Sequence, residues 1–359
     1  MSYDEDITGL PPIKVVGVGG GGCNAVNRMI TEGITGVHFV AVNTDAQQLE
    51  HSKASERMRI GDKVSRGLGV GGDPSLGFKA ADESRDELLE MLRGMDMVFV
   101  TAGMGGGTGT GAAPVVAEVA KLAGALTIAV VTKPFAFEGR MRREAAEDGI
   151  AKLEEFADTV ITIPNDRLLT MADENVTVSD SFCLADDVLR QGISGISDVI
   201  TVPGEVNLDF NDVKRVMGEG GQALMAIGRG TGENRAVDAA HAAIASPLLE
   251  TDVTGARRVL FNVTSSGDLG LSELNMAAKV IQEMVDPDAE IIFGTAIDPR
   301  MTDEIKLTVI ATGFPSSTRR LDDQMESERW AADIFDEIGL DADDVELPAF
   351  LRKRRVTAQ

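Results

Sequence analysis

The sequence predicts an α/β protein in which a parallel, Rossmann-like domain is joined by a long central helix to a smaller α+β domain. Short β-rich segments alternate with helical patterns over residues 13–163, a single helical pattern follows over residues 179–201, and strand patterns return after residue 220. With 359 residues, 43% of them hydrophobic, the chain is long and apolar enough for about two domains with buried cores.

The first domain is expected to contain a parallel sheet. Its strand candidates are apolar at consecutive positions, as strands covered by helices on both faces are. Helical patterns at 112–123 and 141–156 lie between the later candidates, which is typical of βαβ units. The strand candidates are residues 13–18, 37–43, 96–103, 125–132 and 158–163.

The central helix carries apolar side chains at helical spacing and is expected to extend about 30 to 35 Å, at 1.5 Å per residue. Beyond Gly220, two helical patterns lie among four strand candidates, which predicts the α+β domain. The strand candidates there are residues 222–228, 257–264, 290–297 and 305–312, and the helices are 234–246 and 271–285.

These patterns divide the chain into six expected segments. The last one ends in a mixed apolar and basic peptide, and an amphipathic helix is possible at 321–338 before it. The segments are a disordered N-terminus at 1–12, a first domain at 13–178, the central helix at 179–202, a second domain at 203–315, a linker at 316–343 and a C-terminal peptide at 344–359.

Composition and termini narrow the class of protein. A formal net charge of −24 argues against a nucleic-acid partner, because so acidic a surface repels phosphate. Cys23 and Cys183 are the only cysteines, which fits a reducing compartment. The acidic N-terminus does not resemble a secretory signal, and no apolar run approaches the roughly 20 residues that span a bilayer. We therefore expect a cytoplasmic protein without direct membrane insertion.

A first glycine-rich loop, residues 17–25, lies between a predicted strand and a predicted helix. Gly17, Gly19 and Gly22 satisfy the G-x-G-x-x-G pattern, in which glycines let the backbone approach a pyrophosphate at a helix N-terminus. By itself the pattern is weak, because a tight turn without a ligand also explains it. With Asp45 about 20 residues on, it also fits an NAD(P)-dependent oxidoreductase.

A second glycine-rich loop, residues 103–111, again lies between a strand and a helix. Its glycine amides, with the hydroxyls of Thr108 and Thr110, can form an anion-binding nest. The chain lacks G-x-x-x-x-G-K-[ST], so it is not a P-loop NTPase. Two phosphate-binding loops at the carboxyl edge of one sheet suit a triphosphate better than a dinucleotide, which argues against the oxidoreductase.

At these loops the chain resembles the tubulin/FtsZ superfamily of GTPases. Residues 105–111 are similar to the signature loop of that family, and the match extends in order over about residues 13–315. The resemblance implies a GTPase that polymerises head to tail into the filaments of the cell-division (Z) ring. Residues 13–178 are then the GTP-binding domain and 203–315 the activation and polymerisation domain. The other matching segments are 14–29, 42–47, 132–140, 162–169 and 207–213.

The resemblance also assigns roles around bound GTP or GDP. Glu138 and Arg142 are expected at the ribose and phosphates, Phe182 on the base, and Asn165 and Asp187 at the guanine edge. A carboxylate can accept from both N1–H and N2–H₂ of guanine, a donor pair that adenine lacks, so Asp187 would select guanine. The expected nucleotide-binding residues are Gly20, Gly21, Gly22, Cys23, Asn24, Gly103, Gly106, Gly107, Thr108, Gly109, Thr132, Glu138, Arg142, Asn165, Phe182 and Asp187.

No residue is assigned as a metal ligand. The sequence shows no carboxylate cluster or histidine pair for a dedicated metal site, so Mg²⁺ is expected to bind mainly phosphate oxygens and water. Cys23 occupies a position where many relatives carry a small residue such as glycine. It is interpreted as a buried small thiol, with a redox-sensitive phosphate loop as the sharper alternative.

Asn207, Asp209 and Asp212 form N-x-D-x-x-D after the central helix, and the resemblance implies that they take part in hydrolysis. Without it, a polar turn or a helix cap would explain them better. About 14 helical residues, or roughly 20 Å, separate Asp187 from Asp209, so both cannot act on one GTP within one subunit. The three residues are therefore expected to complete the site of a neighbouring subunit. Their retention argues against a non-hydrolysing filament or adaptor protein.

The C-terminal peptide is similar to the docking peptide of the same family. Its apolar side chains and basic end could fold into the groove of a partner, although an unbound terminus is the simpler alternative. The resemblance implies membrane-tethering and regulatory cell-division proteins as partners, at the division site on the inner face of the membrane. The expected partner-binding residues are Leu347, Pro348, Phe350, Leu351 and Arg352.

Overall fold

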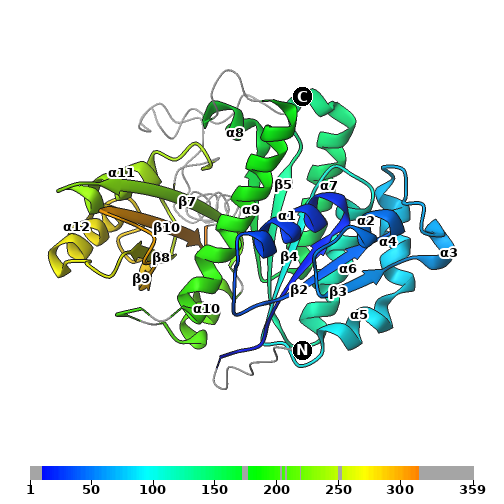
Figure 1. The fold of residues 1–359 in the computed structure, drawn as a ribbon, viewed down its shortest axis with the longest axis horizontal. Helices are drawn as coiled ribbons and strands as arrows, with labels where there is room; N and C mark the ends of the chain where they lie inside the picture. Colours follow the sequence, from blue (N-terminus) through cyan, green and yellow to red (C-terminus); the bar gives the residue numbers. More distant parts are fainter. Residues whose placement is uncertain are drawn as a thin grey trace, which may run out of the picture. The chain divides into compact units, whose positions relative to one another are not determined.

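One ten-stranded sheet runs through the part of the chain that the structure describes, with the strand order β3-β2-β1-β4-β5-β6-β7-β10-β8-β9 (Figure 1). The structure is a computed structural model, and it describes residues 10–171, 177–202, 204–206, 208–218, 220–249 and 253–314. The predicted α/β class is confirmed, with a parallel sheet in the first part of the chain and a mixed sheet in the second.

The first six strands are all parallel and follow the order 3-2-1-4-5-6, which is the Rossmann order. Strand β3 was not predicted, because its sequence ERMR is mostly charged; it lies at the exposed edge of the sheet. The order reverses between β1 and β4, where such folds bind their ligands. The strands are β1 (Ile13–Val18), β2 (His38–Asn43), β3 (Glu56–Arg59), β4 (Met97–Gly103), β5 (Leu126–Lys133) and β6 (Thr159–Pro164).

Helices cover both faces of this parallel sheet, as its consecutive apolar positions predict. Alternate residues of β1 belong to different cores: Val15 packs with α1 and α9, whereas Val16 packs with α4 to α7. The helices are α1 (Gly19–Thr31), α2 (Ala46–Glu50), α3 (Asp62–Ser65), α4 (Pro74–Glu83), α5 (Arg85–Leu92), α6 (Thr108–Leu122), the 3-10 helix η1 (Ala136–Glu138), α7 (Arg140–Phe156) and α8 (Asn165–Met171).

The predicted central helix is α9 (Val178–Thr201), which begins at a capping box formed by Thr177 and Asp180. Ile193 and Ile196 are fully buried, so the helix packs within the molecule rather than along its surface. At Gly195 it approaches β10 so closely that an added Cβ would lie 2.6 Å from a methyl carbon of Thr308. Helix α9 therefore contacts both the parallel and the mixed part of the sheet.

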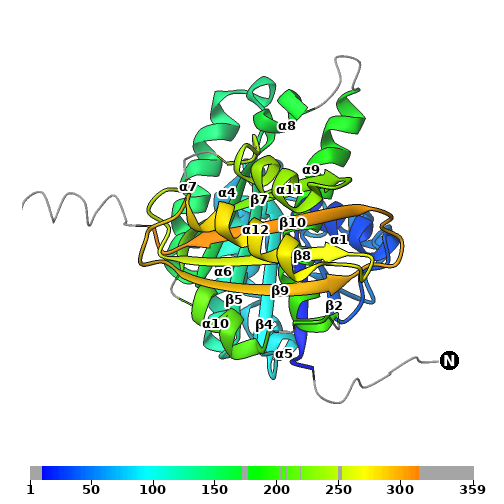
Figure 2. The ribbon, with the colours of Figure 1, turned by 90° about the vertical axis from the view of Figure 1, so that its left-hand side faces the viewer.

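After α9 the chain forms the second part of the sheet, whose four strands and two later helices match the predicted segments within a few residues (Figure 2). Strand β7 pairs in parallel with β6 and antiparallel with β10, so it joins the two parts. The elements are α10 (Phe210–Met217), β7 (Gly221–Thr231), α11 (Arg235–Ile244), β8 (Arg258–Ser265), α12 (Leu271–Gln282), β9 (Glu290–Ile297) and β10 (Glu304–Thr312).

Because one sheet crosses the expected domain limits, the divisions at 178 and 202 stay predictions. The expected linker and C-terminal peptide, with the helix pattern at 321–338, lie outside the described residues, as do residues 1–9. Over the described ranges, no helix combines the length and apolar character needed to cross a membrane.

Two leucines on helices of the parallel domain test the core assignment. Leu153 on α7 is fully buried, whereas Leu122 at the end of α6 is 71% exposed. Leu153→Ala is expected to lower the free energy of unfolding by about 2 to 5 kcal/mol, because it leaves a cavity. Leu122→Ala should change it by about 0.5 kcal/mol or less. Urea unfolding without nucleotide measures both, and equal losses would contradict the described core.

Candidate functional site

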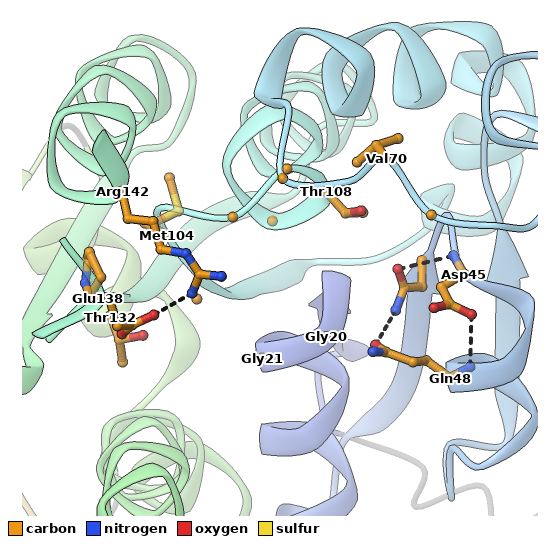
Figure 3. Close-up of a pocket in the computed structure, with 18 of the residues that line it drawn as sticks. Gly20, Gly21, Asp45, Gln48, Val70, Met104, Thr108, Thr132, Glu138 and Arg142 are labelled. Carbon is orange, nitrogen blue, oxygen red and sulfur yellow. Dashed lines mark hydrogen bonds and ion pairs between the residues drawn. The ribbon is translucent and has the colours of Figure 1, made fainter. Parts of the chain in front are cut away.

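A pocket of about 330 Å³ lies where the strand order reverses, at the carboxyl ends of the parallel strands (Figure 3). It is lined by backbone from glycine-rich loops on one side and by polar side chains on the other. Predicted residues that line it are Gly20, Gly21, Gly103, Gly106, Gly107, Thr108, Gly109, Thr132, Glu138, Arg142, Asn165 and Phe182.

The two predicted glycine loops lie against each other, backbone to backbone. A Cβ added at Gly19 would lie 2.8 Å from the backbone nitrogen of Gly109, and one added at Gly22 would lie 2.3 Å from the carbonyl oxygen of Thr101. Gly19 also has a φ of +72°, a conformation that L side chains rarely adopt. The first turns of α1 and α6 therefore line the pocket with backbone amides, which suits phosphate oxygens.

Hydroxyl and amide side chains continue the wall beside these loops. The Thr108 hydroxyl lies 2.7 Å from that of Thr44, and the Asn43 amide donates to Gln48 Oε1 at 3.0 Å. Asp45 caps α2 by accepting from the Gln47 N–H at 2.9 Å and from the Gln48 N–H at 3.3 Å, the second of which is drawn at the right of Figure 3. The Asp45 carboxylate, considered above as part of an NAD(P)-binding pattern, thus has a local structural role.

Glu138 and Arg142 form the opposite wall, drawn at the left of Figure 3. Glu138 Oε1 accepts from the Phe135 N–H at 2.9 Å, and its second oxygen binds the Arg142 guanidinium. The Arg142 side chain is 57% exposed, while that of Glu138 is only 11% exposed. The arginine can therefore turn toward an anion while the glutamate stays anchored.

The far end of the pocket suits a flat, polar ring. The Asn165 side chain is buried, and its oxygen has no hydrogen-bond partner among the described residues. Phe182 packs edge-on against Phe135, with ring centroids 5.5 Å apart, and stays 42% exposed. Burial raises the pKa of Asp186 to about 7, an effect that the charge of Arg28 partly offsets. An orphan amide, a free aromatic face and a desolvated carboxyl thus meet in one place.

Asp187, the predicted guanine ligand, does not line the pocket; its neighbour Asp186 does. The Asp187 carboxylate accepts from Arg190 Nε at 2.8 Å and from Gln191, and it lies 3.7 Å from Arg28 Nε. Burial raises its pKa, but these bonds and charges outweigh that effect and hold the pKa below its usual value.

Helix geometry explains the difference, because adjacent residues of an α-helix point about 100° apart. The pocket-lining residues of α9 recur at helical spacing from Phe182, and Asp186 is in that series while Asp187 is not. In the sequence, this spacing was the available signal that Asp186 shares a helix face with Phe182. The series is Phe182, Ala185, Asp186 and Leu189.

Three other expected nucleotide residues of the first loop do not line the pocket. Gly22 and Cys23 are buried beneath it, and Asn24 is exposed outside the lining. Cys23 Sγ lies 3.6 Å from the Gly17 carbonyl oxygen and 3.8 Å from that of Val42. Burial raises the pKa of the Cys23 thiol to about 12. This geometry fits the buried-thiol interpretation rather than a redox-sensitive loop.

A third loop, residues 69–72, lines the pocket and was missed in the sequence. It lies over the second glycine loop, since a Cβ added at Gly107 would lie 2.6 Å from a methyl carbon of Val70. Gly69, Gly71 and Gly72 all have positive φ. The glycine-rich segment GLGVGG at 67–72 was the available signal.

The expected hydrolytic residues lie away from the pocket of their own chain. Asp209 caps α10 by accepting from the Asp212 N–H at 2.9 Å, and neither residue lines the pocket. Helix α9 continues about 15 residues from Asp186 to its end at Thr201, which is about 22 Å. Asn207 lies outside the described residues, as do Leu347, Pro348, Phe350, Leu351 and Arg352.

Comparisons with known proteins agree with this geometry. Residues 12–173 match the Tubulin/FtsZ family, GTPase domain, and residues 221–315 match the FtsZ family, C-terminal domain. An empty FtsZ dimer from M. jannaschii is 44% identical, with a TM-score of 0.81; the match covers 84% of this chain and 88% of that one. The chain belongs to the tubulin/FtsZ family.

More distant members share the fold of this tubulin/FtsZ-family GTPase. GDP-bound CetZ1 from Haloferax volcanii is 21% identical, with a TM-score of 0.73, and the match covers 89% of this chain and 99% of that one. CetZ2 from the same organism, a protofilament bound to GTPγS, is 23% identical with a TM-score of 0.70, covering 90% and 99%.

Membership of this family shows what the protein does. It binds and hydrolyses GTP, associates with itself into filaments and acts in cell division. The NAD(P)-dependent oxidoreductase is thereby excluded, and so is a filament protein without GTPase activity. Over the described ranges, no group of three or more His, Cys, Asp or Glu side chains is arranged to hold a metal ion.

The two thiols are expected to react very differently. Cys183 is exposed, whereas Cys23 is buried with a raised pKa, so the Cys23 thiol is shielded from reagents and resists ionisation. An aromatic disulfide reagent should label one thiol per chain quickly in native protein and two in denaturant. Cys183→Ser should abolish the fast reaction. Fast labelling of that variant would show that Cys23 is accessible and reactive.

Proposed function

We propose that the pocket holds GTP with its phosphates on the glycine loops and its guanine at Asn165, Phe182 and Asp186. The observation that carries this proposal is the distribution of unsatisfied groups. Backbone amides at two helix N-termini lie at one end, and an orphan amide oxygen and a desolvated carboxyl lie at the other. Arg142 would bind the phosphate and ribose region, and Thr132 and Thr108 add hydroxyl donors.

Mg²⁺ is proposed to bind phosphate oxygens and water. The described pocket fits this arrangement, since its acidic side chains do not converge on a single point and Thr44 and Thr108 place two hydroxyls together. The ion would supply charge neutralisation for the phosphates when GTP is bound.

Asp186, rather than Asp187, is proposed to read guanine. Its carboxylate belongs to the pocket-lining face of α9, while the Asp187 carboxylate is occupied by Arg190 and Gln191. An ionised Asp186 can accept from the N1–H and N2–H₂ donors of guanine, and adenine offers no such pair. Phe182 would stack on the base with its exposed face.

We further propose that hydrolysis requires Asp209 and Asp212 of a neighbouring copy. The length of α9 keeps both carboxylates away from the GTP of their own chain, so a second copy must bring them to it. There they would position the attacking water and accept its proton. Each copy would bind one neighbour through its Asp209 and Asp212 end and another neighbour through its nucleotide pocket. The contact is therefore heterologous, and its repetition gives an open filament.

This arrangement gives a nucleotide cycle. Bound GTP favours the contact, the contact permits hydrolysis, and GDP weakens it. The chains are proposed to assemble head to tail in the cytoplasm, at the division site on the inner face of the membrane. The C-terminal peptide, with Leu347, Pro348, Phe350, Leu351 and Arg352, is proposed to bind membrane-tethering and regulatory proteins. A nucleic-acid partner is not proposed, because the net charge is −24.

The shared site predicts that Asp212→Ala retains GTP binding but loses turnover by about 100-fold, since a positioned carboxylate contributes 10²- to 10⁴-fold. Nucleotide binding and phosphate release are measured separately across protein concentrations. Wild-type turnover per molecule should rise with concentration as filaments form. Equal turnover per molecule in dilute, monomeric protein and in concentrated protein would refute the shared site.

The raised pKa of Asp186 leads us to expect that the affinity for GTP depends on pH. Its pKa of about 7 without nucleotide should fall when guanine donors bind the carboxylate, so binding releases a proton from the protonated form. Affinity is then full above pH 7 and falls by at most about tenfold for each unit below it. Asp186→Asn should weaken binding about 10- to 100-fold and remove this pH dependence.

The matched variant is Asp187→Asn. It should leave the GTP affinity within about threefold of wild type, because the Asp187 carboxylate is bonded within α9 and to Arg28. Equilibrium titration with a fluorescent GTP analogue at several pH values checks both variants. A large loss with Asp187→Asn and none with Asp186→Asn would return the guanine-reading role to Asp187.

A further inference from the structure

The Asp212 carboxylate has an arginine neighbour on its own helix. Arg215 Nη2 lies 3.5 Å from Asp212 Oδ1, and the two residues are three positions apart on α10. Nε of the same guanidinium lies 2.8 Å from Glu290 Oε1 at the first residue of β9. One side chain therefore connects Asp212 to the mixed part of the sheet.

The backbone around Arg215 is held as well. Arg258, the first residue of β8, donates from Nη1 to the carbonyl oxygens of Arg215 at 3.1 Å and of Gly218 at 2.9 Å. At the other end of α10, Asp209 caps the helix. Val213 and Val216 are fully buried. Helix α10, labelled in Figure 1, is thus capped at its first turn, buried along one side and held at its C-terminal end to β8 and β9.

On this helix, the Asp212 side chain remains one-third exposed. A carboxylate that approaches a triphosphate is repelled by it, and the position of a catalytic group strongly affects the rate. A cation beside Asp212 both restrains the carboxylate and partly offsets that repulsion. Two of the three guanidinium nitrogens of Arg215, Nε and Nη2, already face carboxylates, so its position favours holding Asp212 over reaching outward itself.

We propose that Arg215, held by Glu290, is a positioning residue that orients the Asp212 carboxylate for the hydrolytic site of the adjacent copy. The inference rests on the proposed shared site, because Asp212 acts there. On this proposal, the ion pairs of Arg215 with Asp212 and Glu290 affect the rate of hydrolysis and not nucleotide binding.

The first test measures turnover per polymerised subunit together with critical concentration and GTP affinity. Arg215→Ala is expected to lower turnover about fivefold, the effect of one partly exposed ion pair, with the other two quantities within about twofold of wild type. Glu290→Gln should lower turnover about twofold, and Arg215→Lys should retain more turnover than Arg215→Ala. A rise in critical concentration large enough to account for the loss would overturn the inference.

Arg229 provides the matched control. It forms an ion pair with Glu304 at 2.8 Å between β7 and β10, and its side chain is 58% exposed, as is that of Arg215. Arg229→Ala should leave turnover per polymerised subunit unchanged. A loss equal to that of Arg215→Ala would show a general effect of removing a surface arginine and would count against positioning.

A double-mutant cycle separates positioning from direct contact. Asp212→Asn keeps a hydrogen-bonding side chain, so residual turnover should be measurable. Adding Arg215→Ala to it should cause no further loss, because Arg215 acts through the Asp212 carboxylate. A further fivefold loss would indicate that Arg215 itself contacts the neighbouring phosphates. If Asp212→Asn alone retains full turnover, the shared site fails; if it loses turnover and Arg215→Ala does not, only the positioning role fails.

Discussion

The pocket depends on direct contact between the backbones of the loops that follow β1 and β4. Gly19 and Gly22 meet Gly109 and Thr101 at distances that exclude any side chain. The contact extends outward through α4, where a Cβ added at Gly77 would lie 2.2 Å from the carbonyl oxygen of Gly107. Side chains at these positions would separate the loops and turn the amides of the two helix N-termini away from a common ligand.

The long helix α9 imposes the second constraint. Its first turns carry the residues at the base end of the pocket, and its last turn precedes the segment with Asp209 and Asp212. A rigid helix about 36 Å long holds these two sets of groups apart, at 1.5 Å per residue. This separation makes nucleotide binding a property of one chain and makes hydrolysis, as proposed, a property of two.

Arginines link these separated regions to their surroundings. Arg28 of α1 lies beside Asp187 of α9, next to the nucleotide pocket. At the other end, Arg215 and Arg258 connect α10 to β9 and β8. In a chain with a net charge of −24, carboxylates at a phosphate site need such neighbours, because unpaired acidic groups would repel the ligand.

The sequence by itself determined the fold class, the central helix and the two glycine loops, because these depend on periodicity and on residues with distinctive backbone behaviour. Only the tertiary structure decided that Asp186 and not Asp187 lines the pocket, because a difference of one residue on a helix is a rotation of about 100°. It likewise revealed the loop at 69–72 and the charged edge strand β3, whose positions depend on packing against distant segments. The contact of Arg215 with Glu290 joins residues 75 positions apart, and no local pattern records such a contact.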